Sequence, residues 1–148
     1  RANKSFASGK WYWETTITTA GVASMGIASS TWNIATTLYM GNDQYASAIY
    51  YPDGSVYYNG AAAVVAGAVA NGSVIMQAFD TATLKHWLGK NGTWFNSADP
   101  ASGTGACNIV AAGTYFPAYD SRGTTATANF GASAFAYSVP SGFNAGVY

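Results

Sequence analysis

Residues 10–18 read KWYWETTIT, and this run says most about the architecture of the chain. Successive side chains of a β-strand point to opposite faces of its sheet. The alternation divides the run into two sets, Trp11, Trp13, Thr15 and Ile17 on one face and Tyr12, Glu14, Thr16 and Thr18 on the other. Aromatic and β-branched residues of this kind favour strands, so we expect a strand here.

Similar short segments recur between turn signals along the rest of the 148 residues. We expect strands at residues 24–28, 48–51, 56–58, 74–80, 83–88, 93–95, 115–119 and 125–130. Asp53-Gly54 and Asn91-Gly92 favour tight turns, and Thr81-Ala82 and Arg122-Gly123 separate two further strand pairs. No linker or charge run divides the chain. This spacing predicts one all-β domain over residues 1–148, a two-sheet sandwich or a barrel.

Two segments do not follow the strand pattern. Residues 61–70 (AAAVVAGAVA) combine helix-favouring alanines with valines and lack helix caps, so we expect a loop with at most one short helical turn. Residues 96–113 are rich in small residues and contain Pro100, which indicates a long surface excursion. We assign six aromatic side chains in strand patterns to the core: Trp11, Trp13, Phe79, Trp87, Phe116 and Phe130.

The charge content limits the possible partners. Only 8 % of the residues are charged, and six Lys and Arg balance six Asp and Glu. A chain without a basic patch cannot neutralise a phosphate backbone, so nucleic-acid binding is not expected. The longest apolar stretch is about half of what spans a bilayer, so we expect no membrane insertion. Weak charge repulsion favours a protein that is anchored in an assembly or secreted over one in the crowded cytosol.

Catalytic and metal-binding residues are scarce. A single Cys, Cys107, and a single His, His86, exclude an internal disulfide and the usual zinc sites, and we expect neither metal nor cofactor. Glycosidases need two paired carboxylates, but Glu14 is the only Glu, and a hydrogen-bonding role in the structure is favoured for it. A Ser-His-Asp triad would have to use His86, which lies in a predicted strand. We therefore expect no enzyme.

Six segments of the chain resemble SPRY domains in order along the sequence. They are residues 8–14 (SGKWYWE), 25–28 (MGIA), 51–60 (YPDGSVYYNG), 74–92, 115–131 (from YFPA to ATANFG) and 135–143 (FAYSVPSGF). Residues 91–105 are most similar to the bacteriophage and bacterial type. Gly72-Ser73, where the family usually has Gly-Asp, departs from the pattern. The family also carries a strand before residue 8, so that strand is either missing here or supplied by another segment, and the unpaired edge would invite a neighbouring strand.

The resemblance implies a bent, antiparallel two-sheet sandwich of the concanavalin A-like or jelly-roll type. It also implies that loops at one end of the sandwich bind a protein, and it maps these loops to residues 38–45 and 120–123. The candidate ligand-binding residues are Trp32, Tyr39, Asn42, Asp43, Gln44, Tyr45, Asp120 and Arg122. For the loop aromatics, packing over the end of the sandwich is an equally good interpretation.

Three functions are consistent with these observations. The first is a non-enzymatic binding or adhesion module, on a phage virion or another extracellular structure, that recognises a protein partner or a cell-surface receptor. The second is a lectin-like glycan receptor, in which Trp32 or Tyr39 stacks on the sugar and Asn42, Asp43 and Gln44 bind its hydroxyl groups. The third is a structural subunit of a fibre or capsid surface, a homo-oligomer or part of a larger assembly, held together by its exposed sheet edge or its tyrosine-rich hairpin.

Overall fold

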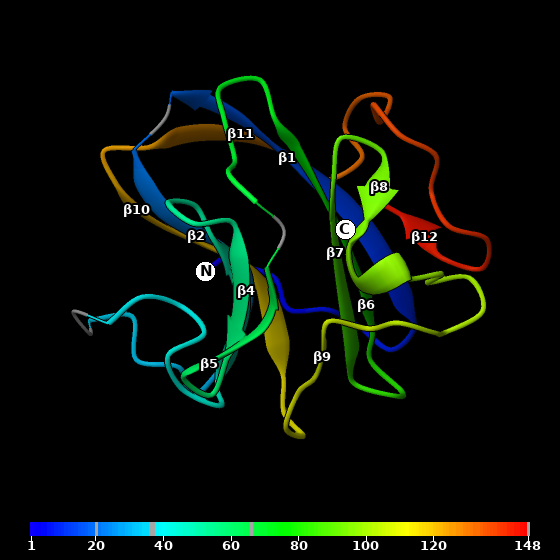
Figure 1. The fold of residues 1–148 in the computed structure, drawn as a ribbon. Helices are drawn as coiled ribbons and strands as arrows, with labels where there is room; N and C mark the ends of the chain where they lie inside the picture. The colour runs from blue at the N-terminus through cyan, green and yellow to red at the C-terminus, as the bar shows by residue number, and fades with distance from the viewer. Residues whose placement is uncertain (20, 36–37, 66, 148) are drawn as a thin grey trace.

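The structure is a computed structural model that describes residues 1–19, 21–35, 38–65 and 67–147. Two sheets pack together as a sandwich, which confirms the predicted fold class (Figure 1). The elements are β1 (Lys10–Thr19), β2 (Val22–Ser29), β3 (Ala46–Tyr50), β4 (Ser55–Tyr58), β5 (Ala61–Val65), β6 (Val74–Asp80), β7 (Lys85–Lys90), β8 (Thr93–Trp94), the 3₁₀ turn η1 (Phe95–Ser97), β9 (Asn108–Ile109), β10 (Tyr115–Arg122), β11 (Thr125–Asn129) and β12 (Asn144–Ala145).

The larger sheet has seven strands and the smaller has five. The order in the first is β11-β1-β6-β7-β8, with β12 parallel to β1 and β9 antiparallel to β7. The order in the second is β10-β2-β3-β4-β5, and all its neighbours are antiparallel. Consecutive strands pair from β2 to β5 in the smaller sheet, whereas in the larger sheet only β6–β7 and β7–β8 of the described strands are such pairs. The strands β10 and β11, which Arg122-Gly123 separates in the sequence, belong to different sheets.

The core between the sheets contains one of the two predicted sets of β1 side chains. Trp13 and Ile17 are almost completely buried there, against residues of both sheets. Ile49 and Val56 contribute from the five-stranded sheet, and Phe79 contributes from the seven-stranded sheet. Of the six aromatics assigned to the core, Trp13, Phe79 and Trp87 are buried, whereas Trp11, Phe116 and Phe130 are only half-buried.

A covering layer lies on the outer face of the seven-stranded sheet. It consists of residues 95–106 and 131–147, the second of which appears in orange and red in Figure 1. Tyr12, Trp87 and Phe143 are buried between the sheet and this layer, with Phe135 and Tyr137 packed against them. Tyr12 and Glu14 of the outward set are therefore buried as well, whereas Thr16 is half-buried and Thr18 is exposed.

The buried carboxylate of Glu14 binds the second segment of the covering layer, residues 131–147, through hydrogen bonds. The side chain is only 3 % exposed. Its Oε1 accepts hydrogen bonds from the Tyr12 hydroxyl at 2.6 Å and from the Tyr137 N–H at 2.9 Å, and its Oε2 accepts one from the Ala136 N–H at 2.8 Å. These bonds offset the cost of burying a carboxylate. Burial, together with the nearby Glu14 carboxylate, raises the pKa of Tyr12.

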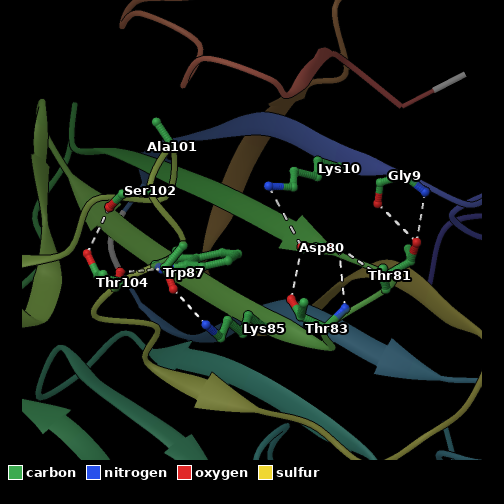
Figure 2. A network of polar contacts seen from close by, with 12 residues as sticks. Gly9, Lys10, Asp80, Thr81, Thr83, Lys85, Trp87, Ala101, Ser102 and Thr104 are labelled. Carbon is green, nitrogen blue, oxygen red and sulfur yellow. Dashed lines mark hydrogen bonds and ion pairs between the residues drawn. The ribbon is translucent and has the colours of Figure 1, made fainter.

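The other part of the covering layer is fastened by side chains of β7 (Figure 2). The Lys85 ammonium donates to the Gly103 carbonyl at 2.7 Å, and the Trp87 indole N–H donates to the Thr104 carbonyl at 2.8 Å. These two hydrogen bonds fix residues 99–104 against the sheet. Nearby, the Asp80 carboxylate closes the β6–β7 turn by accepting hydrogen bonds from the Ala82 N–H at 2.9 Å and from the Thr83 hydroxyl at 2.9 Å.

The structure corrects both predictions for the irregular segments. Residues 61–65 form the edge strand β5 rather than a loop, because pairing with β4 overrides the helix propensity of alanine. Residue 66 lies outside the described residues. The segment 96–113 is not only a surface excursion, since Cys107, Asn108 and Val110 are buried and β9 pairs with β7. Burial raises the pKa of the Cys107 thiol to about 11.

His86 lies between the two sheets and is completely buried. Its Nδ1 lies 2.8 Å from the hydroxyl of Ser47 on β3, and that hydroxyl accepts a hydrogen bond from the Asn108 side-chain amide at 2.8 Å. The ring stacks on Trp13 with 6.4 Å between centroids. This polar pair therefore joins β7 of one sheet to β3 of the other, and burial lowers the pKa of His86 to about 3.

The lowered pKa of His86 predicts a loss of stability in mild acid. Below its ordinary pKa of 6.5 the unfolded chain binds a proton at this residue, while the folded chain does not until about pH 3. The free energy of unfolding therefore falls with decreasing pH over that window, by about 1.4 kcal/mol per pH unit from this residue. Urea unfolding between about pH 5.5 and pH 4 measures this slope, and His86→Gln should have a slope shallower by that amount. Equal slopes in both proteins would contradict the burial of a neutral His86.

Candidate functional site

The outer face of the five-stranded sheet carries the side chains that alternate with the core residues. Met25, Ile49 and Val56 point into the sandwich, so their neighbours Ala48, Tyr50 and Tyr57 point outward. Part of this face is covered by the connection from β2 to β3. Trp32 and Met40 from that connection bury four alanines of the sheet in a small outer cluster, which consists of Ala28, Ala46, Ala48 and Ala118.

Trp32 is therefore a packing residue in this structure. Its side chain is only 7 % exposed, so it offers no open ring face on which a sugar could stack. This outcome corresponds to the second interpretation of the loop aromatics, that they pack over the sandwich. Its physical cause is the row of alanines on the outer face of the sheet, which leaves space that a large side chain fills.

Three tyrosines gather beside this covered part. The ring centroids of Tyr39 and Tyr50 are 4.8 Å apart, those of Tyr39 and Tyr57 are 5.6 Å apart, and those of Tyr50 and Tyr57 are 6.1 Å apart. All three side chains are half-buried. The Tyr57 hydroxyl donates to the Asp53 carboxylate at 3.0 Å, and this hydrogen bond raises the pKa of Tyr57. The rings support one another and hold a fixed aromatic surface.

The loop of residues 38–45 is fastened to the β4–β5 turn. The Asp43 carbonyl accepts from the Asn59 N–H, and the Gly41 carbonyl accepts from the Gly60 N–H, both at 3.0 Å. Gly41 has a φ of +92°, and a Cβ there would lie 2.5 Å from the Tyr57 carbonyl oxygen, so the close approach requires glycine. The loop is thus a rigid support for Tyr39.

The remaining predicted residues of this loop differ in exposure. Asn42 and Asp43 are half-buried, and the Asp43 carboxylate accepts from the Tyr45 N–H at 2.9 Å, as in an Asx-turn. Gln44 and Tyr45 are exposed. Exposed apolar side chains in the same connection are Ile34, Leu38 and Tyr45, at 65 %, 48 % and 40 % exposure.

The structure does not bring the two predicted loops to one end of the sandwich. Residues 38–45 enter β3 where Ala46 pairs with Ala28, whereas Arg122 pairs with Val22 at the opposite end of β2. Six residues of strand separate these positions, which is about 20 Å. Asp120 and Arg122 also belong to β10 rather than to a loop tip. The correction follows from topology, because β10 runs antiparallel to β2 and ends where β2 begins (Figure 1).

We call Tyr39, Tyr50 and Tyr57, together with Leu38 next to Tyr39 in the loop, the tyrosine surface. Sequence reasoning named Tyr39 and Tyr45 as ligand-binding candidates, whereas Tyr50 and Tyr57 entered only as members of the tyrosine-rich hairpin of the third function. Both alternate with buried residues, Ile49 and Val56, and strict use of that alternation would have placed them outside the core. Leu38 belonged to the predicted binding loop, although it was not a candidate residue.

The tyrosine surface is equipped for binding rather than for proton or group transfer. It offers aromatic faces, phenol hydroxyls and exposed apolar groups, with Asp53 as an acceptor at its margin. In the part of the chain that the structure describes, three or more His, Cys, Asp or Glu side chains nowhere gather as a metal ion would require. Nor do the described ranges hold a helix long and apolar enough to cross a membrane.

Comparison with models of known protein families finds no match for this chain, and neither does comparison with curated proteins. The geometry described above is therefore the basis for any statement about function. The resemblance to SPRY domains is a prediction from the sequence.

Substitutions in the β2–β3 connection distinguish packing residues from surface residues. Trp32→Ala should lower the free energy of unfolding by about 3 kcal/mol, because it leaves a cavity over four buried alanines. Leu38→Ala should change it by less than about 0.5 kcal/mol, because the side chain is exposed. Chemical denaturation of the two variants measures the difference. A Trp32→Ala protein as stable as the wild type would show that this ring is not part of a core.

Proposed function

We propose that the chain is a non-enzymatic binding module that recognises a protein partner through the tyrosine surface. The observation that carries this proposal is the mutual packing of Tyr39, Tyr50 and Tyr57 on an outward sheet face, with the exposed Leu38 adjacent to Tyr39 in the chain. Tyrosine is among the residues enriched at binding hot spots, since a rigid ring buries much area with little loss of side-chain entropy.

The low charge of the chain supports a protein as the partner. Interface cores are depleted in charged residues and enriched in aromatics, and the tyrosine surface has that composition. Its loop is held by main-chain hydrogen bonds to the β4–β5 turn, so little ordering is needed on binding. Affinity from such contacts should depend little on salt, because few charges are neutralised.

The placement of the reactive side chains supports a non-enzymatic role. Glu14 is buried and satisfied by three hydrogen bonds, and His86 is enclosed between the sheets with its neighbour Ser47. Neither meets a substrate in this arrangement. We further propose, from the low charge and from the similarity to phage-type SPRY domains, that the module works on a virion or another extracellular structure.

A glycan is the second candidate ligand of the same surface. The observation in its favour is that Tyr39 shares a loop with Asn42, Asp43 and Gln44, whose amide and carboxylate groups suit sugar hydroxyls. Of the two alternative stacking rings, Trp32 is buried, so Tyr39 is the ring that would stack on the sugar.

Selection from a displayed library of protein domains tests the proposed function. Binders chosen on the wild-type chain should lose at least about tenfold in affinity to Tyr57→Ser and to Leu38→Ser. The control is Ile109→Ser, which changes an exposed apolar side chain of β9 in the other sheet. Affinities should change by less than roughly threefold between low and high salt.

Two results would contradict the proposal. One is a set of domain binders that tolerate both substitutions on the tyrosine surface but are lost with Ile109→Ser. The other is a glycan array on which the wild type binds and Tyr57→Ser does not, with no domain binder found, which would establish the glycan function instead.

A further inference from the structure

The two sheets part along one side of the sandwich, where β10 and β11 form their edges. A cavity of about 270 Å³ opens there, lined mainly by Trp13, Thr15, Pro117, Tyr119, Ala126 and Ala128. Cavities of about 150 Å³ are known to hold a benzene-sized guest. This edge cleft therefore has room for at least one large apolar side chain, and the tyrosine surface lies on a different face of the five-stranded sheet.

The floor of the edge cleft is core-facing surface that the smaller sheet leaves open. Ala126 and Ala128 pair with Ile17 and Thr15 of β1, which are both buried, so all four residues share the inner face. Ala128 is nevertheless exposed. An exposed alanine on the inner face of a sandwich is a position at which another side chain could pack without displacing anything.

One polar group is held on this floor. The Thr15 hydroxyl accepts a hydrogen bond from the side-chain amide of Gln77 at 3.0 Å, and both side chains are more than nine-tenths buried. The hydroxyl proton of Thr15 can then be donated to an acceptor in the cleft. A peptide carbonyl has this chemistry.

One wall of the edge cleft, the strand β10, already pairs with an extended segment of the chain. The Pro117 carbonyl accepts from the Ala2 N–H at 2.8 Å, and the Tyr115 carbonyl accepts from the Phe6 N–H at 2.9 Å. Residues 2–6 thus run antiparallel to β10 along its first half. Because alternate residues of a strand direct their backbone groups to the same side, those of Tyr119 also point to this edge. In the described strands, β10 pairs only with β2, so Tyr119 continues the edge without a strand partner.

We propose that an extended segment of a partner polypeptide binds in the edge cleft. Its backbone follows the line of residues 2–6 beyond Arg1, which also lines the edge cleft, and pairs with β10 at Tyr119, antiparallel to β10. An apolar side chain of the segment packs over Ala126 and Ala128, and a carbonyl of the segment accepts from Thr15. This is strand addition, in which main-chain hydrogen bonds give affinity and a pocket selects alternate side chains. The observed pairing of residues 2–6 with this edge is what favours an extended peptide as the occupant.

The test uses a synthetic peptide of alternating valine and threonine with blocked ends, followed by NMR on the isotopically labelled chain. Saturable shifts are expected at the amides of Tyr119, Ala126 and Ala128. Methylating alternate backbone nitrogens of the peptide should weaken binding about tenfold or more, because methylation removes the N–H groups that would donate to β10. Ala128→Leu should weaken binding by a similar factor, because the added side chain fills the edge cleft.

Matched controls separate this proposal from the proposed function. Ala63→Leu changes an exposed alanine of the opposite edge strand, β5, and should bind the peptide like the wild type. Tyr57→Ser should do so too, because the tyrosine surface is not part of the edge cleft. The melting temperature of Ala128→Leu should match that of the wild type, since the position is exposed. If the substitution lowers the melting temperature, the comparison of methylated and unmethylated peptides still tests the proposal on the wild-type protein.

Three results would overturn the inference. One is the absence of saturable binding at millimolar peptide. Another is equal binding of the methylated and unmethylated peptides, which would mean an apolar pocket without strand addition. The third is self-association of the wild type that Ala128→Leu abolishes, which would make a second copy of this chain the occupant.

Discussion

The burial of one carboxylate, that of Glu14, organises the layers of this molecule. A charged group is stable inside a protein only where donors surround it, and here two of the three donors are main-chain N–H groups of the covering segment 131–147. The segment cannot leave the sheet without exposing apolar residues and stranding the carboxylate. Glu14 thus joins residues that are more than a hundred positions apart in sequence, and β1 is buried on both faces from Tyr12 to Thr15.

This layering determines which surfaces remain for binding. The outer face of the seven-stranded sheet is covered by residues 95–106 and 131–147, and part of the other outer face is covered by Trp32 and Met40. Reactive side chains such as His86 and Cys107 are enclosed between or against the sheets. Two surfaces stay open in the described part of the chain and have a shape or composition that suits a partner. They are the tyrosine surface, on a rigid loop and hairpin, and the edge cleft, where the sheets part.

Much of this fold could be predicted from the sequence, because its strands repeat a period-2 pattern and its turns carry Gly, Asn and Asp. The division of β1 into two faces was confirmed in the burial of Trp13 and Tyr12 on opposite sides. Three features could not be predicted. The strand character of residues 61–65 comes from pairing with β4, the burial of Trp32 comes from alanines on three different strands, and the separation of Asp120 from the 38–45 loop comes from the direction of β10. Each depends on contacts between distant segments, which a local pattern does not contain.

Amide hydrogen exchange of the folded protein, residue by residue, tests the central claim most directly. Ala136 and Tyr137 lie in a segment without regular secondary structure, so their N–H groups would exchange rapidly if the segment were a loose tail. Because both donate to buried Glu14, we expect them to be protected to nearly the same free energy as the amides that pair β1 with β6. Exchange of these two amides at the rate of an exposed loop, with β1 still protected, would contradict the account.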